Sequence, residues 1–141
     1  MAAFNKFNQF VEDLGLGIHD FRAANDVLRI YLSNTVPSAS LDLIKADLAE
    51  IAGGNGYTLG GADIQNDQSE TAGTLTVTGV DVTYTASGGS IGPFQYVVLY
   101  NDTPAAPLDP LIGWWDYGSA ITLLTGESFT TDFGTSIFTI A

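Results

Sequence analysis

The first apolar residues of the chain recur every three or four positions, with polar residues between them: Phe4, Phe7, Phe10 or Val11, and Leu14. This spacing predicts an amphipathic helix over residues 4–14, ended by Gly15 and Gly17. An isolated helix of this length is marginal in water. We therefore expect it either to cover one face of the core or to dock onto a neighbouring subunit.

Two further elements are predicted before residue 57. Apolar and polar residues alternate over 27–33, which indicates a half-buried strand with Arg29 and Tyr31 on its outer face. A second helix is expected after Ser38 or Ser40, with one apolar face made of Leu41, Ile44, Leu48 and Ile51. The glycine-rich stretch 53–56 would end that helix.

From Tyr57 onward the apolar period becomes two, which is typical of strands. Residues 94–100 are almost continuously apolar and predict a central strand. Residues 101–110 contain three prolines and two aspartates, so we expect an exposed loop. The predicted strands are 74–78, 80–84, 94–100, 111–117, 120–124, 128–133 and 137–140.

Short strands punctuated by glycine predict a mainly β fold, an antiparallel β-sandwich or flattened barrel with one or two helices in the N-terminal third. The length of 141 residues suits a single domain with a substantial core. Within it, we expect a helix–strand–helix lead over 1–56 and a β-rich body over 57–141.

The charge is divided unevenly along the chain. Residues 46–141 contain no Lys, Arg or His but eleven of the sixteen acidic residues, and the formal net charge is −12. Phosphate contacts need clustered Lys and Arg, so nucleic acid is not an expected partner. The basic residues are all in the first third: Lys6, Arg22, Arg29 and Lys45, with His19 in the same segment.

The residue types present argue against most catalytic and metal sites. The chain has no cysteine, and polar residues interrupt the apolar positions near its start, so we expect no disulfide, no signal peptide and no membrane span. A glycosidase pair could come only from Asp102, Asp109 and Asp116, and a serine-type triad would have to use His19. Neither set has a supporting motif, so the chain is expected to be no enzyme and to need no cofactor.

Two local clusters allow a binding role. In a strand, Trp114 and Asp116 face one side and Trp115 and Tyr117 the other, so Trp114 could stack on a sugar, although core or subunit packing is the commoner use of such aromatics. The stretch 63–70 carries Asp63, Asp67 and Glu70, which suit calcium. It lacks EF-hand spacing and is better interpreted as a solvated acidic turn.

Several segments, in this order along the chain, resemble a family of small structural proteins of tailed bacteriophages and prophages. The similarity lies in the opening Phe-Asn-Lys-Phe, in YLSNT at 31–35, EIAGGNGY at 50–57, IGPFQYVVLYNDT at 91–103, PLIGWWDYGS at 110–119 and FTTDF at 129–133. The resemblance implies assembly into a virion rather than catalysis. It implies no active-site residues.

We therefore expect a virion protein, most simply a capsid decoration or cement protein that contacts the major capsid protein or other virion proteins. It is expected to form a homo-oligomer, with a trimer as the simplest guess. The alternatives are a tail, neck or fibre-associated subunit and, in another class, a carbohydrate-binding module for host attachment. The basic segment is expected to face the particle and the acidic body the solvent. The candidate contact residues are Phe4, Lys6, Phe7, Phe10, Val11, Arg22, Arg29, Asn101, Asp102 and Trp114.

Overall fold

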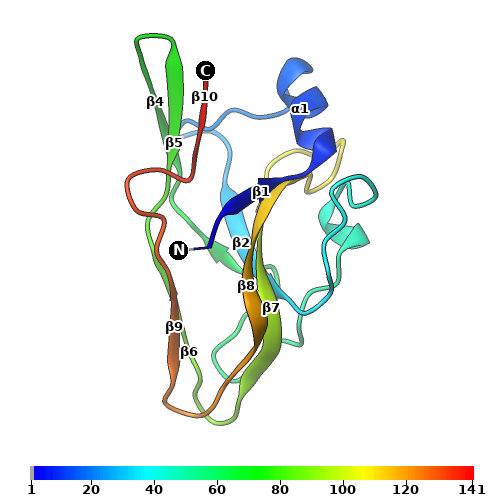
Figure 1. Ribbon diagram of the computed structural model, residues 1–141, viewed down its shortest axis with the longest axis vertical. Coiled ribbons are helices and arrows are strands. Elements are labelled where there is room, and N and C mark those ends of the chain that lie inside the picture. The colour runs from blue at the N-terminus through cyan, green and yellow to red at the C-terminus, as the bar shows by residue number, and fades with distance from the viewer. Residues whose placement is uncertain (1) are drawn as a thin grey trace.

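A long antiparallel pair of strands runs through the centre of the computed structural model, which describes residues 2–141 (Figure 1). This pair belongs to a five-stranded sheet in the order β1–β8–β7–β2–β3. All neighbours in the sheet are antiparallel. Its strands are β1 (Phe4–Lys6), β2 (Leu28–Ser33), β3 (Ala62–Asp63), β7 (Ile91–Asn101) and β8 (Leu111–Leu123).

A second layer of strands covers one face of this sheet. It consists of a three-stranded sheet in the order β10–β5–β4 and a two-stranded ribbon, β6–β9. The three-stranded sheet lies toward one end of the β7–β8 pair and the ribbon toward the other end (Figure 1). The predicted mainly β, antiparallel fold is confirmed, and the sheets do not close into a barrel. The strands are β4 (Asp67–Thr71), β5 (Thr74–Thr78), β6 (Val82–Thr85), β9 (Ser128–Thr131) and β10 (Phe138–Ile140).

The five-stranded sheet buries apolar side chains on both faces. The face toward the second layer carries Ile30, Val97 and Trp115. The opposite face carries Tyr31 and Val98, which pack with residues from outside the sheet. Tyr31 is fully buried, so the prediction of a half-buried strand with an exposed Tyr31 is wrong. Segment 34–61, which has little regular structure, covers the face that was expected to meet solvent (Figure 1).

The N-terminal helix is shorter than predicted. Residues Phe4–Lys6 form β1, and the helix α1 covers Asn8–Gly15. Phe4 pairs with Trp115 across the edge of the sheet, with ring centroids 5.3 Å apart, and the Phe7 N–H donates to the Ile112 carbonyl at 3.1 Å. These long-range backbone bonds hold the start of the segment extended, although its apolar spacing suits a helix.

The second predicted helix is wrong. Only a short 3₁₀ turn, η1 (Lys45–Asp47), forms in this segment, and Leu41 is 76% exposed. The backbone of the segment bonds instead to a distant loop: Lys45 N–H donates to Asp109 O at 2.9 Å, and Leu111 N–H donates to Leu43 O at 3.1 Å. These bonds replace those that a helix would have made locally.

The β-rich body follows the prediction more closely, and its main differences are as follows. The predicted strands 111–117 and 120–124 are one continuous strand, β8. The predicted strand 80–84 begins two residues later, as β6. The acidic stretch 63–70, expected as a turn, contributes to β3 and β4.

The close approach of segment 34–61 to β2 can be tested at Gly61. A Cβ at this position would lie 1.8 Å from the Ile30 carbonyl oxygen, and φ is +73°. Gly61→Ala should lower the free energy of unfolding by about 3 kcal/mol or more. The new Cβ would force the Ile30 backbone to move, and alanine would also have to adopt the left-handed φ that glycine has here. Gly118 is the matched control, with φ +82° and nothing within 4 Å of its Cβ position. Gly118→Ala should cost only about 1 kcal/mol. Urea unfolding measures both, and equal losses would contradict the close approach.

Candidate interaction surfaces

Two exposed leucines, Leu16 and Leu43, lie where the end of α1, segment 38–44 and loop 102–110 meet. A hollow of about 300 Å³ there is lined by residues that include Leu16, Leu43 and Pro107. Leu41 and Leu108 flank it in sequence and are 76% and 61% exposed. We call Leu16, Leu41, Leu43 and Leu108 the leucine surface. Exposed apolar side chains in one patch commonly mark a binding surface.

Backbone hydrogen bonds hold these three segments together. The Asn8 N–H at the start of α1 donates to the Ala39 carbonyl at 2.9 Å. The bonds from Lys45 to Asp109 and from Leu111 to Leu43 attach the other end of segment 38–44 to the loop. The structure thus brings the N-terminal helix and loop 101–110, which both contain predicted contact residues, to the two sides of one surface.

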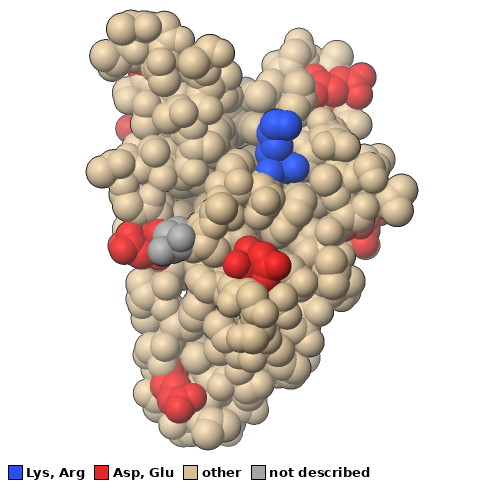
Figure 2. Space-filling model, in the orientation of Figure 1, with Lys and Arg blue, Asp and Glu red and all other residues tan. Residues whose placement is uncertain are grey.

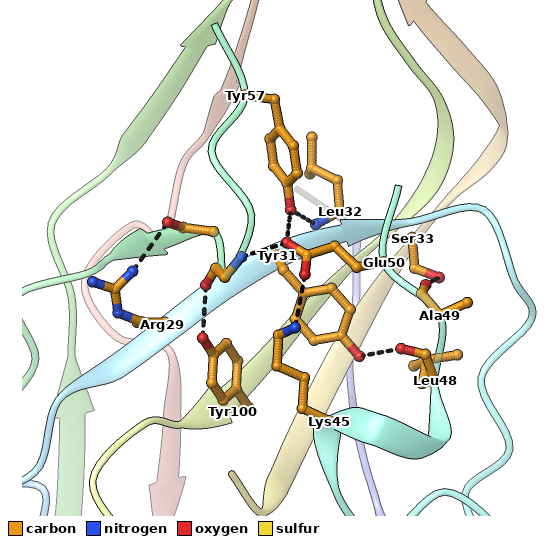
Figure 3. Close-up of polar contacts among 12 residues, drawn as sticks. Arg29, Tyr31, Leu32, Ser33, Lys45, Leu48, Ala49, Glu50, Tyr57 and Tyr100 are labelled. Carbon is orange, nitrogen blue, oxygen red and sulfur yellow. Dashed lines mark hydrogen bonds and ion pairs between the residues drawn. The ribbon is translucent and has the colours of Figure 1, made fainter. Parts of the chain in front are cut away.

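A buried polar cluster around Glu50 fixes the chain that carries the leucine surface (Figure 3). One carboxylate oxygen of Glu50 accepts hydrogen bonds from the Tyr57 hydroxyl at 2.6 Å and from the Gly60 N–H at 2.7 Å. The other lies 2.7 Å from Nζ of Lys45. That ammonium also lies 4.9 Å from the centre of the Tyr31 ring, a cation–π contact.

Tyrosine hydroxyls extend the Glu50 cluster to the backbone (Figure 3). Tyr31 donates to the Leu48 carbonyl at 3.0 Å and Tyr100 to the Gly60 carbonyl at 2.7 Å. Burial raises the pKa of Tyr31, Tyr57 and Tyr100 well above the usual range. These hydroxyls therefore remain protonated donors at any physiological pH. The cluster fastens segment 34–61 to the sheet rather than presenting a reactive group.

A second polar cluster anchors the start of loop 102–110. Asn101 is fully buried, and its amide donates to Oδ2 of Asp26 at 2.7 Å and to Nδ1 of His19 at 3.0 Å. Since Nδ1 accepts, the neutral ring carries its proton on Nε2. Burial lowers the pKa of His19, against the opposing effect of the Asp13 and Asp26 carboxylates.

The predicted contact residues divide by exposure. Phe7, Phe10 and Asn101 are buried within the chain, so they support a surface from beneath and cannot form it. Trp114 is half-buried, with its ring 4.6 Å from that of Phe7. Phe4 and Arg29 are half-buried, and Lys6, Val11, Arg22 and Asp102 are exposed.

Three of the four Lys and Arg side chains pair with acidic residues of the same chain. Arg22 pairs with Asp20, and Lys45 pairs with Glu50. The Nε of Arg29 lies 3.0 Å from Oδ2 of Asp102, close enough for an ion pair although not aligned as a hydrogen bond. Among the Lys and Arg side chains of residues 2–141, only that of Lys6 forms no ion pair with an acidic residue.

A separate apolar groove lies between α1, β1 and β10. It encloses about 470 Å³, and Figure 2 shows it as a notch with basic atoms beside it. The two surfaces use different sides of α1, because Gln9 and Asp13 line the leucine hollow while Phe10, Val11 and Leu14 line the groove. The rest of its lining is Phe4, Lys6, Phe138, Thr139 and Ile140.

The suggested calcium ligands serve the backbone instead. Asp63 accepts from the Gln65 N–H at 2.7 Å, and Glu70 accepts from the Gly73 N–H at 2.6 Å. Within residues 2–141 no three His, Asp or Glu side chains are arranged to hold a metal ion. No helix in that part of the chain is both long and apolar enough to cross a membrane.

Sequence reasoning missed the most prominent features of both surfaces. The pattern places Leu41 on a helix face and Leu108 in a loop, and it predicts β10 only as a strand. The one available signal was the presence of apolar residues in a proline-rich loop. No family model, curated protein or solved structure matches the chain.

Removing the charge of Glu50 should loosen segment 34–61. Glu50→Gln leaves the Lys45 ammonium, whose side chain is only 21% exposed, without its carboxylate. We expect a loss of about 3 kcal/mol in the free energy of unfolding. The control is Asp20→Asn at the exposed Asp20–Arg22 pair, which should hardly change the unfolding midpoint. Chemical denaturation of both variants measures this, and a Glu50→Gln protein as stable as the control would contradict the role of the cluster.

Protonation of His19 should destabilise the fold. Its folded pKa lies below the unfolded value of 6.5, so the folded state favours the neutral ring and stability falls as the pH drops below about 6.5. A second proton would point from Nδ1 at the Asn101 amide donor. In His19→Gln the decline in unfolding free energy between about pH 7 and pH 5 should be smaller than in the wild type. Identical slopes in the two proteins would contradict this.

Proposed function

We propose that the protein is a structural component of tailed-phage particles that decorates the capsid and binds across joints between capsid subunits. The observation that carries this proposal is the leucine surface, an exposed apolar patch on a molecule of net charge −12. The sequence resemblance to phage structural proteins supports the same role. So does the rigid fixing of the patch by the Glu50 cluster, which suits repeated docking in one geometry.

Apolar contact is the attachment mode that the surface supports best. Burying an exposed leucine contributes about 1.5–3 kcal/mol, so a few such side chains give a weak contact. Many copies on one particle would add to the stability of the shell, and oligomers would bind with greater avidity than single copies. The acidic remainder of the molecule would face solvent and keep particles apart.

The same surface could serve a tail, neck or fibre-associated subunit. Copy number separates the two locations, because shell proteins occur in hundreds of copies and tail components in multiples of three or six. A carbohydrate-binding role is less well supported, because Trp114 is half-buried against Phe7 and does not present an open stacking platform.

The proposal predicts that leucine-surface substitutions release the protein from capsids. In Leu41→Asp/Leu108→Asp, two exposed leucines become charged without disturbing the core, and binding to capsids lacking the protein should weaken at least about tenfold. The matched control is Leu124→Asp, at a leucine that is 61% exposed and lies outside this surface.

Gel densitometry against the major capsid protein measures the occupancy of each variant, and cryo-electron microscopy of the particles locates the protein. Full occupancy by the double variant would contradict the role of the leucine surface. Density confined to the tail would contradict the decoration role itself.

A further inference from the structure

Lys6 is a cation without a partner in a chain rich in carboxylates. The other three basic side chains each lie against an acidic residue. Lys6 is exposed at the end of β1, and among residues 2–141 it is the only charged side chain lining the apolar groove. A ligand that fits this groove must therefore be mainly apolar, and a carboxylate on it would find a free counter-charge.

Two strands with a free edge border the same groove. β1 is the edge of the five-stranded sheet, and β10 is the edge of the three-stranded sheet, where it pairs only with β5. All three residues of β10 line the groove. Alternate N–H and C=O groups of an edge strand point away from its partner and can pair with an added strand.

The floor of the groove is already packed by aromatic rings. The Phe138 ring stacks on Phe4 at 5.4 Å and meets Phe10 edge-on at 5.5 Å. Val11, on the adjoining side of α1, is 54% exposed. A ligand would thus enter a preformed apolar site, which lowers the cost of ordering it.

We propose that this groove binds an extended segment of a partner protein whose apolar residues alternate with polar ones and which carries a carboxylate. Its backbone adds as a strand to the free edge of β10, its apolar side chains contact Val11 and Phe138, and its carboxylate pairs with Lys6. This is peptide recognition by strand addition, with side-chain pockets supplying specificity. A second copy of the chain fits less well, because two molecules of net charge −12 repel each other.

The test uses the full chain and a synthetic probe, Ac-TVTVTE-NH₂, whose glutamate lies on the same strand face as its valines. Binding is measured by calorimetric titration and by amide NMR shifts. Binding should shift the amides of β10 and β1. Lys6→Gln should weaken binding by about twofold to fivefold, as expected for an exposed ion pair. Replacing the glutamate of the probe by lysine should weaken binding to the wild type and strengthen binding to Lys6→Glu.

A matched pair of valines tests the apolar wall. Val11→Asp should weaken probe binding by about tenfold or more, because it places a charge against the apolar segment. Val36→Asp is the control, at an exposed valine (72%) outside the groove, and should bind the probe like the wild type.

N-methylated probes test the added strand. Methylating the amides of one alternate set removes the donors on one edge of the probe and should abolish binding, whereas methylating the other set should not. Equal binding of the two methylated probes would overturn strand addition, and an unchanged affinity in Val11→Asp would overturn the site. Self-association of the chain that the probe does not disrupt, mapped to β10, would show that the occupant is a second copy and also overturn the proposal.

This inference can fail separately from the proposed function. The groove and the leucine surface share no residue. Loss of probe binding in Val11→Asp with full capsid occupancy supports the groove alone. Loss of occupancy in Leu41→Asp/Leu108→Asp with normal probe binding supports the leucine surface alone.

Discussion

Both faces of the β7–β8 pair are apolar, and the chain has to cover both of them. Tyr31, Val98 and Tyr100 point to one side of the five-stranded sheet, while Val97, Leu99 and Trp115 point to the other. The second layer of strands covers only one of these sides. The other is covered by segment 34–61, which lacks the repeating backbone bonds of a helix or sheet. Its order has to come from side chains.

The Glu50 cluster supplies that order. The Glu50 carboxylate accepts hydrogen bonds from Tyr57 and Gly60 and pairs with Lys45. It thereby holds together the parts of the segment on either side of Glu50. Buried polar groups of this kind are costly unless every partner is satisfied, and they then favour a single arrangement. Because the segment is shaped by these polar contacts, its leucines are not all turned inward. The exposure of Leu41 and Leu43 is thus a consequence of how the second face of the sheet is covered.

Internal ion pairing also changes what the charge distribution means. The basic N-terminal third would form a cationic face if its side chains were free. Instead Arg29 pairs with Asp102, which lies far along the chain, and Lys45 pairs with Glu50 in the same segment. The outer surface is left strongly acidic, with Lys6 as its one unpaired cation among residues 2–141. Apolar contact and a few specific polar pairs are then the means of association that remain.

Local pattern was sufficient to predict the elements whose environment repeats along the chain. The continuous apolar run at 94–100 and the alternation at 28–33 and 74–78 indicate strands, because strands buried on both faces have continuous apolar runs and half-buried strands have alternating ones. The mainly β, antiparallel architecture follows from those strands and the glycines between them. The opposite faces of Trp114 and Trp115 follow from the same alternation.

The elements that were predicted wrongly are those whose backbone bonds to a distant segment. Residues 41–51 have helical apolar spacing, but the Lys45 N–H and the Leu43 C=O bond to Asp109 and Leu111, which are more than sixty residues away. Phe4 likewise pairs with the distant residue Trp115 and forms part of strand β1. The groove beside β10 likewise depends on contacts between remote positions, since residues near the two ends of the chain line it. Periodicity reports only local environment, and such contacts exist only once the chain has folded.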